Sequence, residues 1–138
     1  MNATGGLMEN PWAWTKANAH LLALESPMGV GFSYCDRMIR GDGPCENSDD
    51  GTAAANRAAL LDFFAKFPEL REGGLYLAGE SYAGVYLPTL ARELLADPAA
   101  RDAVPLRGVL VGDPCTDGTV QAESMDQLWY AHKNGLGE

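Results

Sequence analysis

Residues 79–84, Gly-Glu-Ser-Tyr-Ala-Gly, place one serine between small residues. The hexapeptide follows a short apolar run at residues 75–78 and precedes a helix-like stretch that extends to about Ala96. A serine at a tight strand-to-helix turn projects its hydroxyl above the sheet, which is the geometry of a nucleophile elbow. Such a turn needs small residues two positions either side of the serine. Gly79 and Ala83 meet that need, although the generic pattern has Gly where this chain has Ala83.

A serine held in this way acts as a nucleophile when a base takes its proton and N–H donors bind the oxyanion. Ser81 is the predicted nucleophile, and the backbone N–H of Tyr82 is the predicted oxyanion donor. In folds that carry such a nucleophile elbow, the catalytic triad follows the chain order Ser, Asp, His. Asp113 and His132 follow Ser81 in that order. A local triad is therefore one hypothesis. Taken alone, the hexapeptide also fits a glycine-rich turn with an exposed serine and no catalytic role.

Strand-like and helix-like patterns alternate along the chain. The apolar runs predict strands at residues 20–24, 75–78 and 106–111. Three helices are predicted: one capped by Thr52 or by Asp49 and Asp50 and ended by Pro68, one that reaches about Ala96 and contains Pro88, and one that Gly135 ends. This order predicts an α/β fold in which helices cover a parallel sheet. Three strands leave apolar edges unpaired, which indicates a slice of a larger sheet.

Composition limits the function classes. The chain has 138 residues, 46% hydrophobic and 21% charged, with a net charge of −9. Without a Lys/Arg cluster, we expect no nucleic-acid partner. Since no apolar run approaches the roughly 20 residues of a membrane span, we expect no such span. Met1 is not followed by a signal-peptide pattern. We expect no cofactor and no metal, and the sequence indicates no oligomeric state.

The three cysteines leave two possibilities open. Cys35 and Cys45 bracket a polar, glycine-containing segment that ends at Pro44, and a disulfide between them would contribute about 2–3 kcal/mol by closing a short loop. Cys115 is then left over, which suggests a partner elsewhere. The alternative is three reduced thiols. Asn2, in Asn-Ala-Thr, is a candidate glycosylation site.

Several segments together resemble one enzyme family. Residues 24–34 contain Glu-Ser-Pro-Met-Gly-Val-Gly-Phe-Ser-Tyr and precede the Gly-Glu-Ser-Tyr-Ala-Gly hexapeptide. Residues 10–14 (Asn-Pro-Trp-Ala-Trp), 63–69 (Phe-Phe-Ala-Lys-Phe-Pro-Glu) and 111–117 (Val-Gly-Asp-Pro-Cys-Thr-Asp) add three more motifs. In this order the motifs resemble the serine carboxypeptidase family. At Asp113 the family pattern has Asn, which weakens the local triad.

The resemblance implies an α/β-hydrolase fold, with residues 1–138 as its incomplete, central part and residues 35–51 as a Cys-bounded loop insert. It implies that Ser81 is the nucleophile, that the triad Asp and His lie farther downstream, and that a second oxyanion donor lies upstream. It also implies that Glu80 hydrogen-bonds the substrate's C-terminal carboxylate. Two carboxyls share a proton only if one is protonated, so this recognition favours acidic pH.

The predicted function is a serine-type carboxypeptidase that acts on peptide or protein C-termini. By resemblance it is secreted or lysosomal/vacuolar, and its Cys35–Cys45 disulfide is favoured. We expect residues 1–138 alone to be inactive. The alternatives are an acyltransferase on the same scaffold, a non-catalytic homologue and a general lipase or esterase, the last of which has no need of Glu80.

Overall fold

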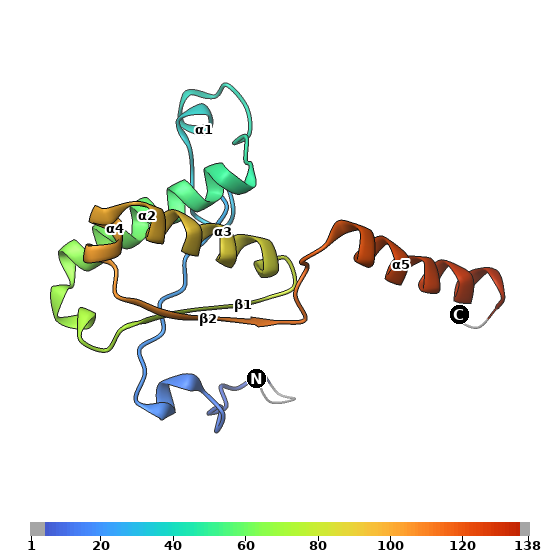
Figure 1. The fold of residues 1–138 in the computed structure, drawn as a ribbon, viewed down its shortest axis with the longest axis horizontal. Coiled ribbons are helices and arrows are strands. Elements are labelled where there is room, and N and C mark those ends of the chain that lie inside the picture. The colour runs from blue at the N-terminus through green and yellow to red at the C-terminus, as the bar shows by residue number, and fades with distance from the viewer. Residues whose placement is uncertain (1–4, 136–138) are drawn as a thin grey trace.

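The computed structural model describes residues 5–135, apart from the side chains of 123–128. Its helices and strands alternate, and their order is η1 (Trp14–Ala17), α1 (Asp36–Arg40), α2 (Asp49–Lys66), η2 (Pro68–Arg71), β1 (Leu75–Glu80), α3 (Ala83–Ala96), α4 (Pro98–Ala103), β2 (Leu106–Gly112) and α5 (Gly118–Lys133). Figure 1 shows α2, α3 and α4 in one layer beside the two strands. The predicted α/β class is confirmed, and the arrangement is consistent with part of an α/β-hydrolase fold.

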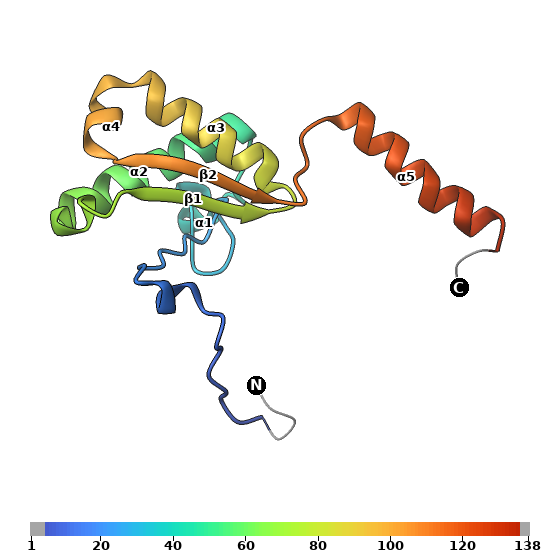
Figure 2. The same cartoon turned by 60° about the horizontal axis from the view of Figure 1, so that its bottom comes forward.

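The two strands pair in parallel, with Leu77 opposite Val109 and Glu80 opposite Gly112. They are joined by the crossover through α3 and α4, as a parallel pair requires. Because the strands run the same way, both end at one edge of the sheet (Figure 2). The turn that carries Ser81 lies at this carboxyl edge, since it directly follows β1.

A small apolar core joins the helical layer to the sheet. Its buried members come from α2, β1, α3 and the α4 corner: Ala53, Leu60, Phe64, Leu77, Leu90, Leu94, Ala100 and Val104. The opposite face of the sheet is open in the described part of the chain, where Tyr76 is 61% and Leu110 55% exposed. Glu80 is on this open face, since it alternates with the inward-facing Leu77 and Gly79 along β1.

The N-cap of helix α2 lies one residue before the predicted caps. It is Ser48, because its Oγ accepts a 3.1 Å hydrogen bond from the Gly51 N–H. Asp49 and Asp50 instead occupy the first turn, where their negative charge suits the helix dipole. Thr52 is inside the helix, where its N–H donates to the Ser48 carbonyl at 2.8 Å, so the prediction of Thr52 as a cap was wrong.

The predicted strand at residues 20–24 is wrong. This segment has no regular structure, and Leu21 is 66% exposed. A strand is completed by the backbone groups of a neighbour, and no strand in the described range 5–135 runs beside this segment. The sheet therefore has two strands here instead of three. Helix α4 was not predicted, although Asp97 and Pro98 supply an N-cap and a first-turn proline.

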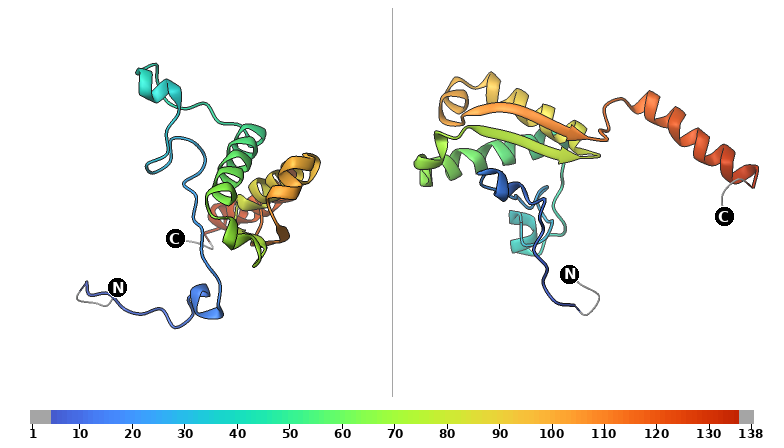
Figure 3. Two further views of the ribbon diagram at one scale, coloured as in Figure 1. Left: turned by 90° about the vertical axis from the view of Figure 1, so that its left-hand side faces the viewer. Right: turned by 90° about the horizontal axis from the view of Figure 1, so that it is seen from below.

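The cysteine-bounded insert is closed by a disulfide between Cys35 and Cys45. The loop contains α1 and stands clear of α2 and α3 in the left-hand view of Figure 3. Its base is tied to the preceding segment, because the Asn47 amide donates to the Met28 carbonyl at 2.9 Å. Cys115 is a free, half-buried thiol.

Replacing Cys35 and Cys45 together by Ser should lower the free energy of unfolding by about 2–3 kcal/mol, because the unfolded chain gains the freedom of an open loop. Chemical denaturation measures this loss. Cys115→Ser is the control, with an expected change of about 0.5 kcal/mol or less. If the double variant were as stable as the wild type, the loop closure would contribute nothing.

Candidate functional site

The turn after β1 holds Ser81 in a left-handed backbone conformation, with φ of 58°. A non-glycine residue in this region costs on the order of 1 kcal/mol, so the surroundings must hold it there. The Ser81 N–H donates to the Gly112 carbonyl at 3.0 Å. The Ser81 carbonyl accepts from the N–H groups of Gly84 at 3.0 Å and Cys115 at 2.8 Å. Thus the end of β2 and the segment after it fix the turn, and the Ser81 side chain stays exposed.

Small residues allow the strand end and the helix start to meet. A Cβ added at Gly79 would overlap the Cβ of Ala83 and lie 3.2 Å from Leu87 Cδ1. A Cβ added at Gly84 would overlap the carbonyl oxygen of Cys115 and lie 2.8 Å from its backbone nitrogen. The structure therefore has the close approach that the sequence pattern predicts around Ser81.

Tyr82 is the N-cap residue of α3, so its backbone N–H is at the helix terminus, where N–H groups lack intrahelical partners. Within residues 5–135, no hydrogen bond occupies this N–H. The Tyr82 hydroxyl lies 3.3 and 3.4 Å from the two carboxylate oxygens of Asp49. From the sequence, Asp49 is predicted only as a helix cap, because no local spacing links two residues 33 positions apart.

The Asp49 carboxylate raises the pKa of the Tyr82 phenol, because its negative charge disfavours the phenolate. Partial loss of hydration adds to the rise, as do Tyr86 and Cys115 to a smaller degree. The Tyr86 ring packs edge-on against Tyr82, with ring centroids 4.9 Å apart. The side chain of Tyr82 is therefore a neutral hydrogen-bond donor.

Glu80 is the last residue of β1 and is exposed at the carboxyl edge of the sheet. Among the ion pairs of the described residues, none involves Glu80. Its carboxyl group is therefore open to a ligand that approaches Ser81 over the open face of the sheet. A charged or hydrogen-bonding group of a substrate is the kind of partner that fits this position.

The structure does not bring the members of the local triad together. Asp113 directly follows β2 at the same edge as Ser81, with φ of 41°. His132 is in the last turn of α5, and this helix leads away from the sheet in Figures 1 and 2. The predicted glycosylation site, Asn2, lies outside the described residues.

Among the described residues, no group of three or more His, Cys, Asp or Glu side chains is placed to hold a metal ion. Likewise, none of the described helices is long and apolar enough to cross a membrane.

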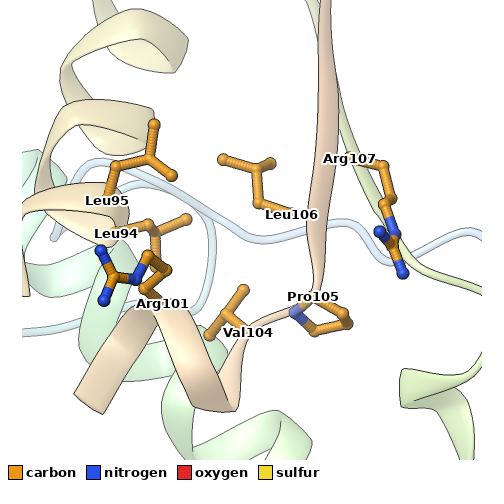
Figure 4. Close-up of a pocket in the computed structure, with 7 residues that line it drawn as sticks. All are labelled: Leu94, Leu95, Arg101, Val104, Pro105, Leu106 and Arg107. Carbon is orange, nitrogen blue, oxygen red and sulfur yellow. The ribbon is translucent and has the colours of Figure 1, made fainter. Parts of the chain in front are cut away.

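One pocket, of about 240 Å³, lies at the corner between α3, α4 and β2 (Figure 4). Its lining includes Leu94, Arg101 and Leu106. Leu106 begins β2, so the pocket is at the amino end of the strand, whereas ligands of parallel α/β sheets bind at the carboxyl ends. The Ser81 turn is therefore the candidate functional site.

Gly84→Ala should lower the free energy of unfolding by about 1–3 kcal/mol, because the new methyl group meets backbone atoms of Cys115 that cannot move independently. Gly118→Ala is the matched control, since nothing lies within 4 Å of a Cβ there. Chemical denaturation of both variants checks the difference. An unchanged stability of Gly84→Ala would contradict the close approach.

The sequence of this chain is similar to those of known proteins. The family model for serine carboxypeptidase matches residues 1–136. The chain is 41% identical over 129 residues to the lysosomal protective protein of Mus musculus, covering 92% of this chain and 24% of that protein. It is 39% identical over 123 residues to a serine carboxypeptidase of Caenorhabditis elegans, covering 89% and 24%.

A third relative is serine carboxypeptidase-like 36 of Arabidopsis thaliana, 34% identical over 126 residues, covering 91% of this chain and 25% of that protein. The chain thus spans about a quarter of the length of the curated relatives it matches. The family match extends over nearly all of the sequence and includes the Ser81 turn. This chain belongs to the serine carboxypeptidase family.

Proposed function

We propose that the protein carrying this chain is a serine-type carboxypeptidase, which releases C-terminal amino acids from peptides through an acyl-enzyme at Ser81. The observation that carries the proposal is the left-handed Ser81 turn between β1 and α3. This turn, which we interpret as a nucleophile elbow, exposes the serine at the carboxyl edge of the sheet, beside the unoccupied N–H of Tyr82. Membership in the family supports the reaction class.

In the proposed reaction, Ser81 Oγ attacks the carbonyl carbon of the last peptide bond while a base takes the hydroxyl proton. The carbonyl oxygen becomes an oxyanion, and the Tyr82 N–H donates to it. The C–N bond then breaks, the released amino acid takes a proton, and water hydrolyses the ester left on Ser81. His132 is on α5, which leads away from the sheet (Figure 1), and the family resemblance implies a triad Asp and His farther downstream, so in this proposal the base and acid are residues outside 1–138. Residues 1–138 alone should therefore be inactive.

Glu80 is proposed to recognise the free carboxylate of the substrate. It immediately precedes Ser81, and its carboxyl group is exposed and free of cationic partners in the described structure. To donate a hydrogen bond to a carboxylate, the Glu80 carboxyl group must carry its proton. A carboxypeptidase that needs this proton is favoured by acidic pH. An enzyme that cleaves uncharged esters has no substrate carboxylate for Glu80 to bind.

We propose a secreted or lysosomal/vacuolar location. The Cys35–Cys45 disulfide suits an oxidising compartment, and the name of one relative, the lysosomal protective protein, places that relative in the lysosome. An acyltransferase on this scaffold is the alternative function, because it would share Ser81 and differ in the acceptor that attacks the acyl-enzyme. A non-catalytic homologue would have no reactive serine.

A fluorophosphonate probe should label Ser81 in the protein that carries this chain, and Ser81→Ala should abolish the labelling, since the probe reacts only with an activated serine. Mass spectrometry of the labelled peptide identifies the site. Ser26→Ala is the control and should leave the labelling intact. Persistent labelling of Ser81→Ala would show that another serine is reactive.

Glu80→Gln should flatten the decline in peptidase activity with rising pH, because the amide remains a donor at every pH. Glu80→Ala should lower kcat/KM on free C-termini by about ten- to a hundredfold, the value of one hydrogen bond to a charged group. Peptides with amidated C-termini provide the control substrate and should respond little. Identical pH profiles for wild type and Glu80→Gln on both substrates would reduce Glu80 to a turn residue and favour the acyltransferase.

A further inference from the structure

The first turn of α2 contacts α3 at two separate points. Asp49 accepts hydrogen bonds from the Tyr82 hydroxyl at 3.3 and 3.4 Å. Asp50 pairs with Arg92, nearly three turns farther along α3, at 2.6 Å. The two carboxylates are neighbours in sequence, share one helical turn and carry the same charge. They differ in their partners: Asp49 contacts Tyr82, the residue next to Ser81, whereas Asp50 pairs with Arg92 in the second half of α3.

The backbone of the Ser81 turn is held from two sides. The N–H and the carbonyl of Ser81 bond Gly112, Gly84 and Cys115, and the Tyr82 carbonyl accepts from the N–H groups of Val85 at 2.9 Å and Tyr86 at 3.2 Å. Within residues 5–135 no hydrogen bond involves the N–H of Tyr82, which the proposed reaction needs free. The Tyr82 ring is held in addition by Asp49 and by the edge-on Tyr86.

From these contacts we infer that Asp49 is a positioning residue, which acts through the Tyr82 hydroxyl to hold the Tyr82 N–H in the direction of the oxyanion. The inference rests on the proposed function, because it assigns the N–H to the oxyanion formed at Ser81. An oxyanion donor is effective only when it is already in place as charge develops. Asp49 adds a restraint from α2 to the one that the backbone hydrogen bonds of the turn supply.

The chemistry of the pair suits such a role. Tyr82 stays a donor because Asp49 raises the pKa of its phenol, and the acceptor is a carboxylate with two oxygens in reach. Asp49 itself begins α2 directly after the Ser48 cap, so its backbone is fixed by the helix. The contact between Asp49 and Tyr82 therefore connects the start of α2 to the start of α3.

The test compares four variants of the protein that carries this chain: Asp49→Ala, Tyr82→Phe, their combination, and Asp50→Ala as the matched control. The readouts are the rate constant for fluorophosphonate labelling of Ser81, and kcat and KM on a peptide substrate. Loss of an entire oxyanion donor costs about 10²–10³ in rate, so a donor that is only less restrained should cost about 3- to 30-fold.

We expect Asp49→Ala and Tyr82→Phe each to slow labelling and kcat by this factor, with KM nearly unchanged. The combined variant should be no slower than either one, because both remove the same hydrogen bond. Asp50→Ala should react at about the wild-type rate. Asp49→Ala should also lower the pKa of Tyr82, which an absorbance titration against Tyr82→Phe measures.

Three results would overturn the inference: wild-type rates in both single variants, effects that multiply in the combined variant, or an equal loss in Asp50→Ala. Tyr82→Phe removes the same hydrogen bond between Tyr82 and Asp49 without changing α2. If Asp49→Ala fails to fold, the rates of Tyr82→Phe alone test the inference. If wild-type Ser81 were not labelled at all, the proposed function would fail and this inference with it. If the wild type is labelled normally and the variants react at the wild-type rate, the positioning role of Asp49 is refuted while the proposed function stands.

Discussion

The left-handed conformation of Ser81 is the constraint on which the rest of the site depends. It reverses the chain within one residue, so that a strand and a helix leave the same point in different directions. An L-residue does not hold this conformation without support. The support comes from the end of β2 and the segment after it, because Gly112 and Cys115 bond both backbone groups of Ser81. The Ser81 turn therefore depends on the parallel sheet and cannot form from its hexapeptide alone.

The parallel arrangement also explains why separate parts of the sequence meet at this edge. When strands run in parallel and helices return between them, strand ends and helix starts lie on one side. β1 and β2 end there, and α2 and α3 begin there. Asp49 and Tyr82 approach each other because both begin helices, although 33 residues separate them. The disulfide loop directly precedes α2, so it belongs to the same end of the molecule.

The sequence predicted the local features well because their causes are local. Glycine and alanine around Ser81, Pro68 after α2 and the alternating element order each depend on neighbours within a few residues. Residues 20–24 were mispredicted because a strand depends on a distant partner, which an apolar run does not reveal. The cap of α2 was misassigned because several polar residues in a row could each cap a helix. The contact between Asp49 and Tyr82 was missed because no periodicity or motif encodes it.

The departure of Ala83 from the generic pattern has a steric explanation. A Cβ at Gly79 would overlap the Cβ that Ala83 already has, so the gap between strand end and helix start holds one methyl group and no more. The requirement is therefore on the pair: one member must be glycine, and the other may be alanine. Gly79 satisfies it from the strand side, which leaves Ala83 free to provide a better helix former than glycine at the first position of α3. The relaxed motif is thus compatible with a tight turn, and Ala83 by itself does not count against a catalytic Ser81.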